Sequence, residues 1–221
     1  MNTAKTASCG GLWWKKDRKE NNSITNALYL QVAAALAERV PSESKSKTYC
    51  AQAIEHAEWF LSSGLINAEN TVADSLSVET CLPAGPNFSY NNGATIAGLV
   101  EIYLHLGEIR YLDTATRIAH GVLKPLTDGH GILVEHTYPD DMDPNSAQFK
   151  GVFARSLAAL HKVRPEPVFA DFLRRNADAI VKSDTDEKGR LGPHWQGPSF
   201  EADVSSHSSA LDCLVAAAAV S

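Results

Sequence analysis

A two-helix unit that occurs three times along the chain is the feature that most constrains its fold. In residues 88–107, apolar side chains recur at helical spacing until Gly107, a residue type that often ends helices. A second apolar stripe of the same period follows in residues 108–123. The three copies read SITNALYLQVAAALAERV with KTYCAQAIEHAEWFLSSG, FSYNNGATIAGLVEIYLHLG with EIRYLDTATRIAHGVL, and QFKGVFARSLAALHKV with VFADFLRRNADAIVKS.

The second helices of these units superpose at regular intervals. Tyr49, Tyr111 and Phe172 occupy the same place in the three copies, at offsets of 62 and 61 residues, and a further helix is expected over about residues 206–220. Hairpins that repeat in this way predict an all-α fold, an (α/α)6 toroid whose inner and outer helices alternate around an axis. A closed ring of this kind has twelve helices, and the sequence predicts about seven of them. We therefore expect one incomplete toroid domain over residues 1–221, in which only GILVEHTY is compatible with a short strand.

The composition excludes several classes of function. The chain has 221 residues, 44% hydrophobic and 21% charged, as in a globular protein with a substantial core. A net charge of −6 argues against a general nucleic-acid binder. No apolar run is long enough for a membrane span, and residues 1–14 contain no apolar segment of a secretory signal.

The cysteines and the other candidate metal ligands give no sign of a bound ion. Cys9, Cys50, Cys81 and Cys213 are widely scattered, so free thiols and any of three disulfide pairings remain open. No His/Cys/Asp/Glu spacing is typical of a metal site, and no glycine-rich phosphate loop occurs. The sequence therefore predicts neither a metal nor a cofactor.

Five stretches, in this order, resemble glycoside hydrolase family 76, the α-1,6-mannanase family, and in particular its fungal members. They are CGGLWW, NNSITNALYL, FSYNNGATIAG, QFKGVFARSLAAL and SHSSALDCLVAA, and they extend over almost the whole chain from Cys9 onward. The resemblance implies an (α/α)6 barrel, hydrolysis of α-1,6-mannosidic bonds with retention, and mannan or a mannose-containing oligosaccharide as the partner. It also implies a secreted or cell-wall protein.

The resemblance further implies that the catalytic pair of the family is absent from this chain. In the family, two adjacent aspartates precede the segment that CGGLWW resembles, and here only eight residues precede Cys9. We therefore expect the C-terminal portion of the family domain, inactive alone. The adjacent Asp140 and Asp141, with Asp143, lie among prolines in what we interpret as a solvated acidic loop, where neither carboxyl would have the raised pKa of a glycosidase acid.

The polar starts of the inner helices are the candidate sugar-binding positions. In a toroid these ends surround a central funnel, the natural place for a ligand. Tyr90, Asn91 and Asn92 would offer an aromatic surface and amides to sugar hydroxyls, whereas the alternative for one asparagine is N-capping. Trp13 and Trp14 are candidates for stacking on a mannose ring; adjacent residues in an extended segment point opposite ways, so we expect at most one to face the funnel.

Three further polar or aromatic positions complete the predicted substrate-binding set. Asn26 lies inside the first inner helix, where its amide needs partners, either a neighbouring helix or a sugar. Lys150 lies on the inner helix of the third unit, and Trp195 lies in GPHWQGP, a predicted loop at the funnel. Arg155 falls close to the apolar stripe of the same helix, so we expect it to meet either a ligand or a carboxylate across the core. Asp212 is one candidate partner, and a buried ion pair is the favoured interpretation.

Two other functional classes remain open at this point. A non-catalytic relative would retain a carbohydrate- or partner-binding surface without turnover. An unrelated toroid, such as an epimerase or polysaccharide lyase, would need a His/Tyr/Arg constellation, and none is evident. In every case the open toroid would expose the apolar flanks of ALYLQVAAAL and ALDCLVAAAAV, which predicts self-association.

Overall fold

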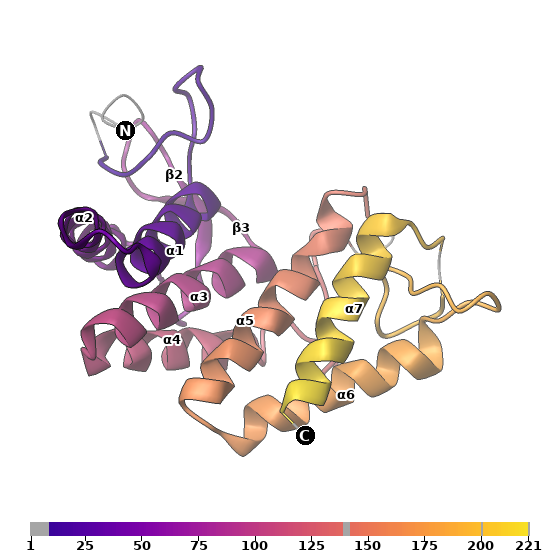
Figure 1. The fold of residues 1–221 in the computed structure, drawn as a ribbon. Coiled ribbons are helices and arrows are strands. Elements are labelled where there is room, and N and C mark those ends of the chain that lie inside the picture. Colours follow the sequence, from indigo (N-terminus) through magenta and orange to yellow (C-terminus); the bar gives the residue numbers. More distant parts are fainter. Residues whose placement is uncertain (1–8, 139–141, 200, 221) are drawn as a thin grey trace. The chain divides into compact units, whose positions relative to one another are not determined.

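The computed structural model describes residues 9–138, 142–199 and 201–220, and this part of the chain contains seven α-helices (Figure 1). Each helix lies within a few residues of its predicted position. The helices are α1 (Ser23–Arg39), α2 (Glu43–Ser62), α3 (Ser89–Leu106), α4 (Ile109–Val122), α5 (Phe149–Val163), α6 (Pro167–Ser183) and α7 (Val204–Ala219). A short 3-10 helix, η2 (Ser146–Gln148), precedes α5.

The helices belong to two compact units. The first comprises residues up to 87 together with 94–118, and the second comprises residues 88–93 together with everything from 119 onward. Helices α3 and α4 each contribute to both units, because the divisions fall inside them. A single domain over residues 1–221 therefore stays a prediction.

The first unit is built on the antiparallel hairpin of α1 and α2. Small and apolar side chains such as Ala27, Leu30 and Ala34 are fully buried on α1, which lets neighbouring backbones approach closely. Gly98 of α3 uses this space, because a Cβ there would lie 3.2 Å from the Ala27 carbonyl oxygen. Arg39, at the end of α1, forms an ion pair with Glu101 of α3, at 2.9 Å, and so joins these two helices.

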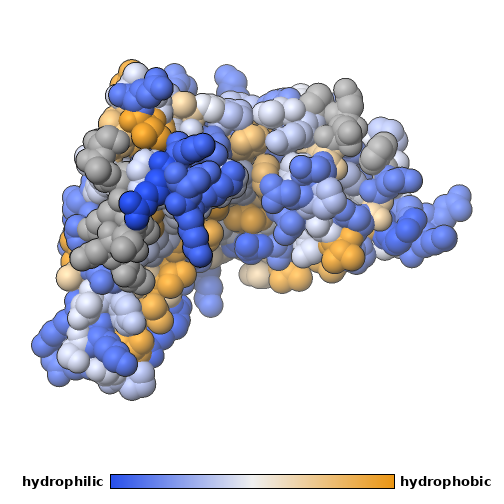
Figure 2. Space-filling model, turned by 90° about the horizontal axis from the view of Figure 1, so that it is seen from above, coloured by the Kyte–Doolittle hydropathy of each residue, from blue (hydrophilic) through white to orange (hydrophobic). Residues whose placement is uncertain are grey.

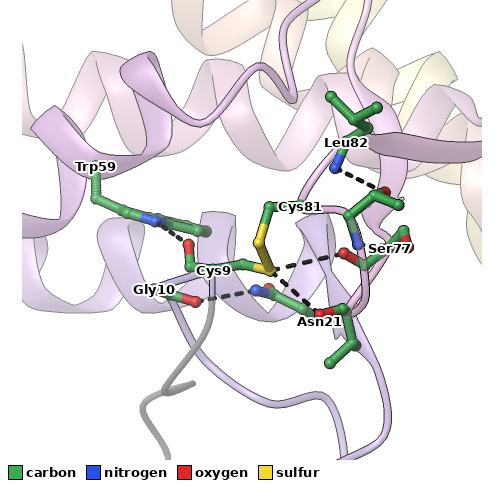
Figure 3. The surroundings of a disulfide bond; sticks show 9 residues. Cys9, Gly10, Asn21, Trp59, Ser77, Cys81 and Leu82 are labelled. Atoms are coloured by element: carbon green, nitrogen blue, oxygen red, sulfur yellow. Dashed lines mark hydrogen bonds between the residues drawn. A yellow bond between two sulfur atoms is a disulfide. The ribbon is translucent and has the colours of Figure 1, made fainter.

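A small antiparallel sheet accompanies this hairpin, and the sequence did not predict it. Its strands β1 (Asn21–Asn22), β2 (Ala73–Leu76) and β3 (Pro83–Asn87) pair in the order β1-β2-β3. The disulfide between Cys9 and Cys81 fixes the segment that leads into β1 (Figure 3), while Cys50 and Cys213 are free.

The second unit packs α5 against α7 and α6 (Figure 1). Glycines make the closest approaches, because a Cβ on Gly151 would lie 2.7 Å from the Ser209 Cα. A Cβ on Gly93 would lie 2.7 Å from the Phe153 Cα. Around these points the core is apolar and aromatic, and includes the fully buried Phe169.

A tight loop follows each outer helix and extends the repeat beyond the helices. Asn67, Asp128 and Asp186 open the three loops. In each, the side-chain oxygen accepts a hydrogen bond from the backbone N–H four residues later, at 2.8–2.9 Å. Isolated bridges close the loops, as between Thr127 and Leu133. The segment GILVEHTY is part of the second loop and forms no strand, so that expectation was wrong.

Large apolar side chains are exposed on several described helices, and the two predicted flanks are among them. Val32 on α1 is 53% exposed and Val215 on α7 is 67% exposed, but Leu104 on α3 and Val181 on α6 are also 54% and 62% exposed. Figure 2 shows apolar residues in patches among hydrophilic ones on one face of the molecule. Self-association through these flanks stays a prediction. Among the described helices, none is long and apolar enough to cross a membrane.

Candidate functional site

A cavity of about 210 Å³ in the second unit brings together residues from three separate segments. The loop before α5, the first turn of α5 and the segment before α7 each supply part of its wall. The lining residues are Asp128, Val134, Glu135, His136, Tyr138, Met142, Lys150, His194 and Gln196. Most of these side chains carry a hydrogen-bonding group, which is typical of a site for a polar ligand.

Glu135 is a buried carboxyl at this cavity, with 1% of its surface exposed. The backbone N–H of Ser89 donates to it at 3.2 Å, and the Ser89 hydroxyl donates a second hydrogen bond. Ser89 is the first residue of α3, so the carboxyl takes up donors that the start of a helix leaves unpaired. Burial nevertheless raises the pKa of Glu135 to about 7, because it disfavours the charged form more than the Ser89 hydrogen bonds favour it.

Lys150 supplies the opposite charge from the first turn of α5. Its side chain is 1% exposed, and its ammonium donates to the carbonyl oxygen of Pro193 at 2.6 Å. The same nitrogen lies 4.7 Å from the centre of the Trp195 ring, within range of a cation–π interaction. Burial lowers the pKa of Lys150 to about 8, and the negative charges of Glu135 and Asp184 oppose this shift.

An aromatic cluster continues from the cavity to the start of α3. Tyr138 lines the cavity, and its ring lies 6.0 Å from that of Phe88 in a stacked arrangement. Phe88 in turn stacks on Tyr90 at 5.6 Å, and Tyr90 lies 4.1 Å from Phe149. The predicted Tyr90 therefore supports this wall, whereas Tyr138, which the sequence analysis missed, is the ring that faces the cavity.

Asn91 and Asn92 lie inside α3, since the helix begins at Ser89. Both are fully buried, and the Asn92 amide donates to the carbonyl oxygen of Phe88 at 2.8 Å. Because the Glu135 carboxyl accepts from Ser89 at the start of the helix, the structure assigns to a distant loop the capping role that we had considered for an asparagine.

Trp195 lies beneath the cavity, since its side chain is fully buried under the Lys150 ammonium. Its neighbours His194 and Gln196 are the residues of this segment that reach the cavity wall. The structure thus brings Lys150 and the 194–196 segment together at one cavity, although the Trp195 indole itself has no exposed face.

The remaining predicted site residues lie in the first unit. Asn26 is fully buried, and its amide accepts from the Leu12 N–H at 2.8 Å and donates to the Asn21 side chain at 2.9 Å. It therefore holds the CGGLWW segment against α1. Trp13 is half-buried, whereas Trp14 is 44% exposed with the Lys15 ammonium 3.7 Å from its ring centre.

The second unit also contains the residues of two other predictions, the Arg155–Asp212 ion pair and the acidic segment around Asp143. Arg155 and Asp212 do form an ion pair, at 2.6 Å, but 57% of the arginine side chain is exposed, so the expected burial was wrong. Asp143 is exposed, and its carboxylate accepts from the Ser146 N–H at 2.7 Å before α5. The adjacent Asp140 and Asp141 lie outside the described residues. In the part of the chain that the structure describes, no group of three or more His, Cys, Asp or Glu could hold a metal ion.

Comparisons with known proteins identify the fold. The sequence matches Glycosyl hydrolase family 76 over residues 2–220. A solved structure of the GH76A alpha-1,6-mannanase from Salegentibacter sp. HEL1_6 is 25% identical, with a TM-score of 0.83, over 100% of this chain and 66% of that chain. An inactive variant of that mannanase, with two adjacent aspartates replaced, is a complex with alpha-1,6-mannotetraose and has a TM-score of 0.85.

A more distant relative has the same fold. Dfg5 from Chaetomium thermophilum, in complex with glucosamine, is 22% identical with a TM-score of 0.83, over 100% of this chain and 57% of that chain. No curated protein matches the sequence. The chain spans about three fifths of the length of these solved structures. The all-α class, helical hairpins of an incomplete (α/α)6 toroid, is thereby confirmed.

Proposed function

Since the chain belongs to glycosyl hydrolase family 76, we propose that it forms the glycan-binding part of an α-1,6-mannan hydrolase and that its second-unit cavity binds mannose residues. The single observation that carries this proposal is the composition of that cavity. It joins a buried carboxyl, a buried ammonium and an aromatic ring within about 210 Å³. The partner would be mannan or a mannose-containing oligosaccharide, and the setting that of a secreted or wall-associated protein.

The chemistry of the cavity suits a neutral, hydroxyl-rich ligand. Each sugar hydroxyl both donates and accepts, and the wall offers an acceptor in Glu135 and donors in Lys150 and Gln196. The Lys150 ammonium offsets one of the two carboxyl groups that line the cavity, Asp128 and Glu135, so neither sign of charge is in large excess, and a strongly charged ligand is disfavoured. The Tyr138 ring supplies the apolar surface on which the C–H face of a pyranose packs.

We further propose that residues 1–221 alone do not hydrolyse mannan. In the Salegentibacter mannanase the inactive variants are those with two adjacent aspartates replaced. The family places such a pair before the segment that CGGLWW resembles. Among the described residues, the Glu135 carboxyl accepts from Ser89 at the start of α3, and the exposed Asp143 accepts from the Ser146 N–H before α5.

The test is calorimetric titration of the chain with α-1,6-mannotetraose, together with a chromatographic assay for its hydrolysis. We expect binding without turnover. Tyr138→Ala should weaken binding about three- to tenfold, the range of a lost aromatic contact, whereas Tyr138→Phe, which keeps the ring, should bind nearly as wild type. Tyr49→Ala on α2 is the matched control.

Each result has a distinct meaning. Equal affinities for Tyr138→Ala and Tyr49→Ala would refute the cavity as the binding site. Hydrolysis by the purified chain would refute the proposed inactivity, and its loss in Asp141→Asn would then assign the reaction to Asp141 and its neighbours in the sequence. Binding of a non-mannose glycan in place of mannotetraose would favour the non-catalytic binding protein.

A further inference from the structure

Two N-glycosylation sequons occur in the chain, and the proposed function uses neither of them. A sequon is an asparagine followed, after any residue except proline, by serine or threonine. The first begins at Asn21 and the second at Asn87. In both, the serine is the first residue of a helix, Ser23 of α1 or Ser89 of α3. The sequence alone therefore has no basis for preferring one sequon to the other.

The two asparagines belong to the same small sheet of the first unit. Asn21 is in β1 and Asn87 is the last residue of β3, and β2 lies between these two strands. Each asparagine is therefore in a strand that has a single partner in this sheet. An N-linked glycan is bulky and hydrophilic, so the asparagine that carries it has to lie at the surface. The surroundings of the two side-chain amides distinguish the sequons.

Asn21 has no room for a glycan in the folded chain, because only 1% of its surface is exposed. Its Nδ2, the atom to which a glycan would be linked, donates to the Gly10 carbonyl oxygen at 3.0 Å (Figure 3). Its Oδ1 accepts from the Asn26 Nδ2 at 2.9 Å. The disulfide between Cys9 and Cys81 holds the segment that contains Gly10 in place. A glycan at Asn21 would have to displace that segment.

Asn87 has the opposite surroundings. It is half-buried, and the two residues before it in β3, Gly85 and Pro86, are exposed. Its backbone pairs with that of Ala73 in β2. Its side-chain amide makes no hydrogen bond to the described part of the chain and is not among the buried amides that lack a partner there. The Asn87 Nδ2 therefore reaches solvent, and a glycan linked to it would break no contact of the fold.

We propose that Asn87 is an N-glycosylation site of this protein and that Asn21 is not. The donor is a lipid-linked oligosaccharide pyrophosphate. The bond from Nδ2 to the anomeric carbon forms, the bond from that carbon to the pyrophosphate breaks, and Nδ2 gives up one proton as the lipid pyrophosphate leaves. The glycan then lies beside the open edge of β3, where it also hinders pairing with a strand of another chain. This inference rests on the secretory setting of the proposed function.

The buried Ser89 is compatible with modification at Asn87. A sequon is modified as the chain enters the secretory pathway, before it folds, so the serine has to be accessible only in the unfolded chain. After folding, the Ser89 hydroxyl donates to the Glu135 carboxyl, a contact in which Asn87 has no part. In the folded protein only the asparagine has to lie at the surface.

The test is mass-spectrometric mapping of the full chain, secreted from a yeast host by means of a fused secretion signal. Removing the glycans with a peptide N-glycosidase in heavy-oxygen water converts each glycosylated asparagine to a labelled aspartate. We expect the label at Asn87 and none at Asn21 in the folded, secreted fraction. An unlabelled Asn87, or a label at Asn21, in that fraction would overturn the proposal.

Variants and native digestion test the position of the glycan. Asn87→Gln should remove the glycan, whereas Asn145→Gln, at an exposed asparagine outside any sequon, should leave it in place. Endoglycosidase H should cleave the wild-type glycan without denaturation, and cleavage only after denaturation would contradict an exposed site. Because the fused signal supplies the secretory route, an unmodified Asn87 would overturn this inference without bearing on mannotetraose binding by the second-unit cavity.

Discussion

The buried pair of Glu135 and Lys150 should give the protein an unusual dependence of stability on pH. Burial raises the pKa of Glu135 from 4.5 to about 7 and lowers that of Lys150 from 10.5 to about 8. Each shift means that the fold disfavours the charged form of that group. Both groups are charged together only between about pH 7 and pH 8. The free-energy cost of burying the two charges is therefore greatest in that range.

The sign follows from proton counting on each side of that window. Between pH 4.5 and 7 the folded chain keeps the Glu135 proton that the unfolded chain has lost, so stability falls as pH rises. Between pH 8 and 10.5 the unfolded chain keeps the Lys150 proton that the folded chain has lost, so stability rises with pH. At about 1.4 kcal/mol per pKa unit, the Glu135 contribution between pH 5 and pH 8 is about 2 to 3 kcal/mol.

The assay is urea unfolding of wild type and two isosteric variants at pH 5, 8 and 10. Relative to wild type, Glu135→Gln should gain about 2 to 3 kcal/mol of unfolding free energy between pH 5 and pH 8. Lys150→Met should be more stable than wild type at pH 8, and this difference in unfolding free energy should shrink as pH rises to 10. A difference between Glu135→Gln and wild type that does not change with pH would refute the reasoning, because it would mean that the carboxyl is ionised at pH 5 in the folded state.

Two further predictions concern stability away from this pair. Replacing Cys9 and Cys81 by serine should lower the unfolding free energy by about 2 to 4 kcal/mol, because their disulfide closes a 72-residue separation; urea unfolding that is identical with and without the disulfide would contradict this. Gly151→Ala should cost about 1 to 3 kcal/mol, because the new Cβ would lie 2.7 Å from the Ser209 Cα. A melting temperature equal to wild type would show that α5 and α7 can separate freely.

The helices could be predicted because their periodicity is carried by the sequence itself. Apolar side chains at intervals of three and four residues have one favourable arrangement, with their shared face buried, and α3, α5 and α6 begin within one residue of the predicted position. The starts of α2 and α7 were missed by two to four residues. The first turn of a helix needs no buried stripe, so periodicity does not define it.

The small sheet could not be predicted by the same means. β3 reads PAGPN, two prolines and a glycine in five residues, which is the opposite of a strand-forming composition. It forms because it pairs at the edge of β2, where a proline without an N–H is tolerated. The pairing of Ala73 with Asn87 depends on tertiary contacts that no local pattern records.

The sequence also carries a signal for the three tight loops, which a search for helical periodicity does not detect. Asn67, Asp128 and Asp186 occur 61 and 58 residues apart, close to the interval of the helices. Asn and Asp are the residues whose short side chains accept from backbone N–H groups further along a turn. Aligning the loops as well as the helices would have placed GILVEHTY in a turn and excluded a strand there.

Glu135 and Lys150 show why one half of the candidate site was found and the other was not. Lys150 could be placed on the inner helix of the third unit because apolar periodicity defines that helix, although the pattern predicted burial for Arg155 and not for Lys150. Glu135 lies in a loop, and its burial depends on Ser89, 46 residues earlier in the chain. A buried ammonium beside a buried carboxyl stabilises a fold less than apolar side chains of the same size would. The cost is consistent with a binding role, because a sugar hydroxyl can accept from the N–H groups of Lys150 that Pro193 leaves available.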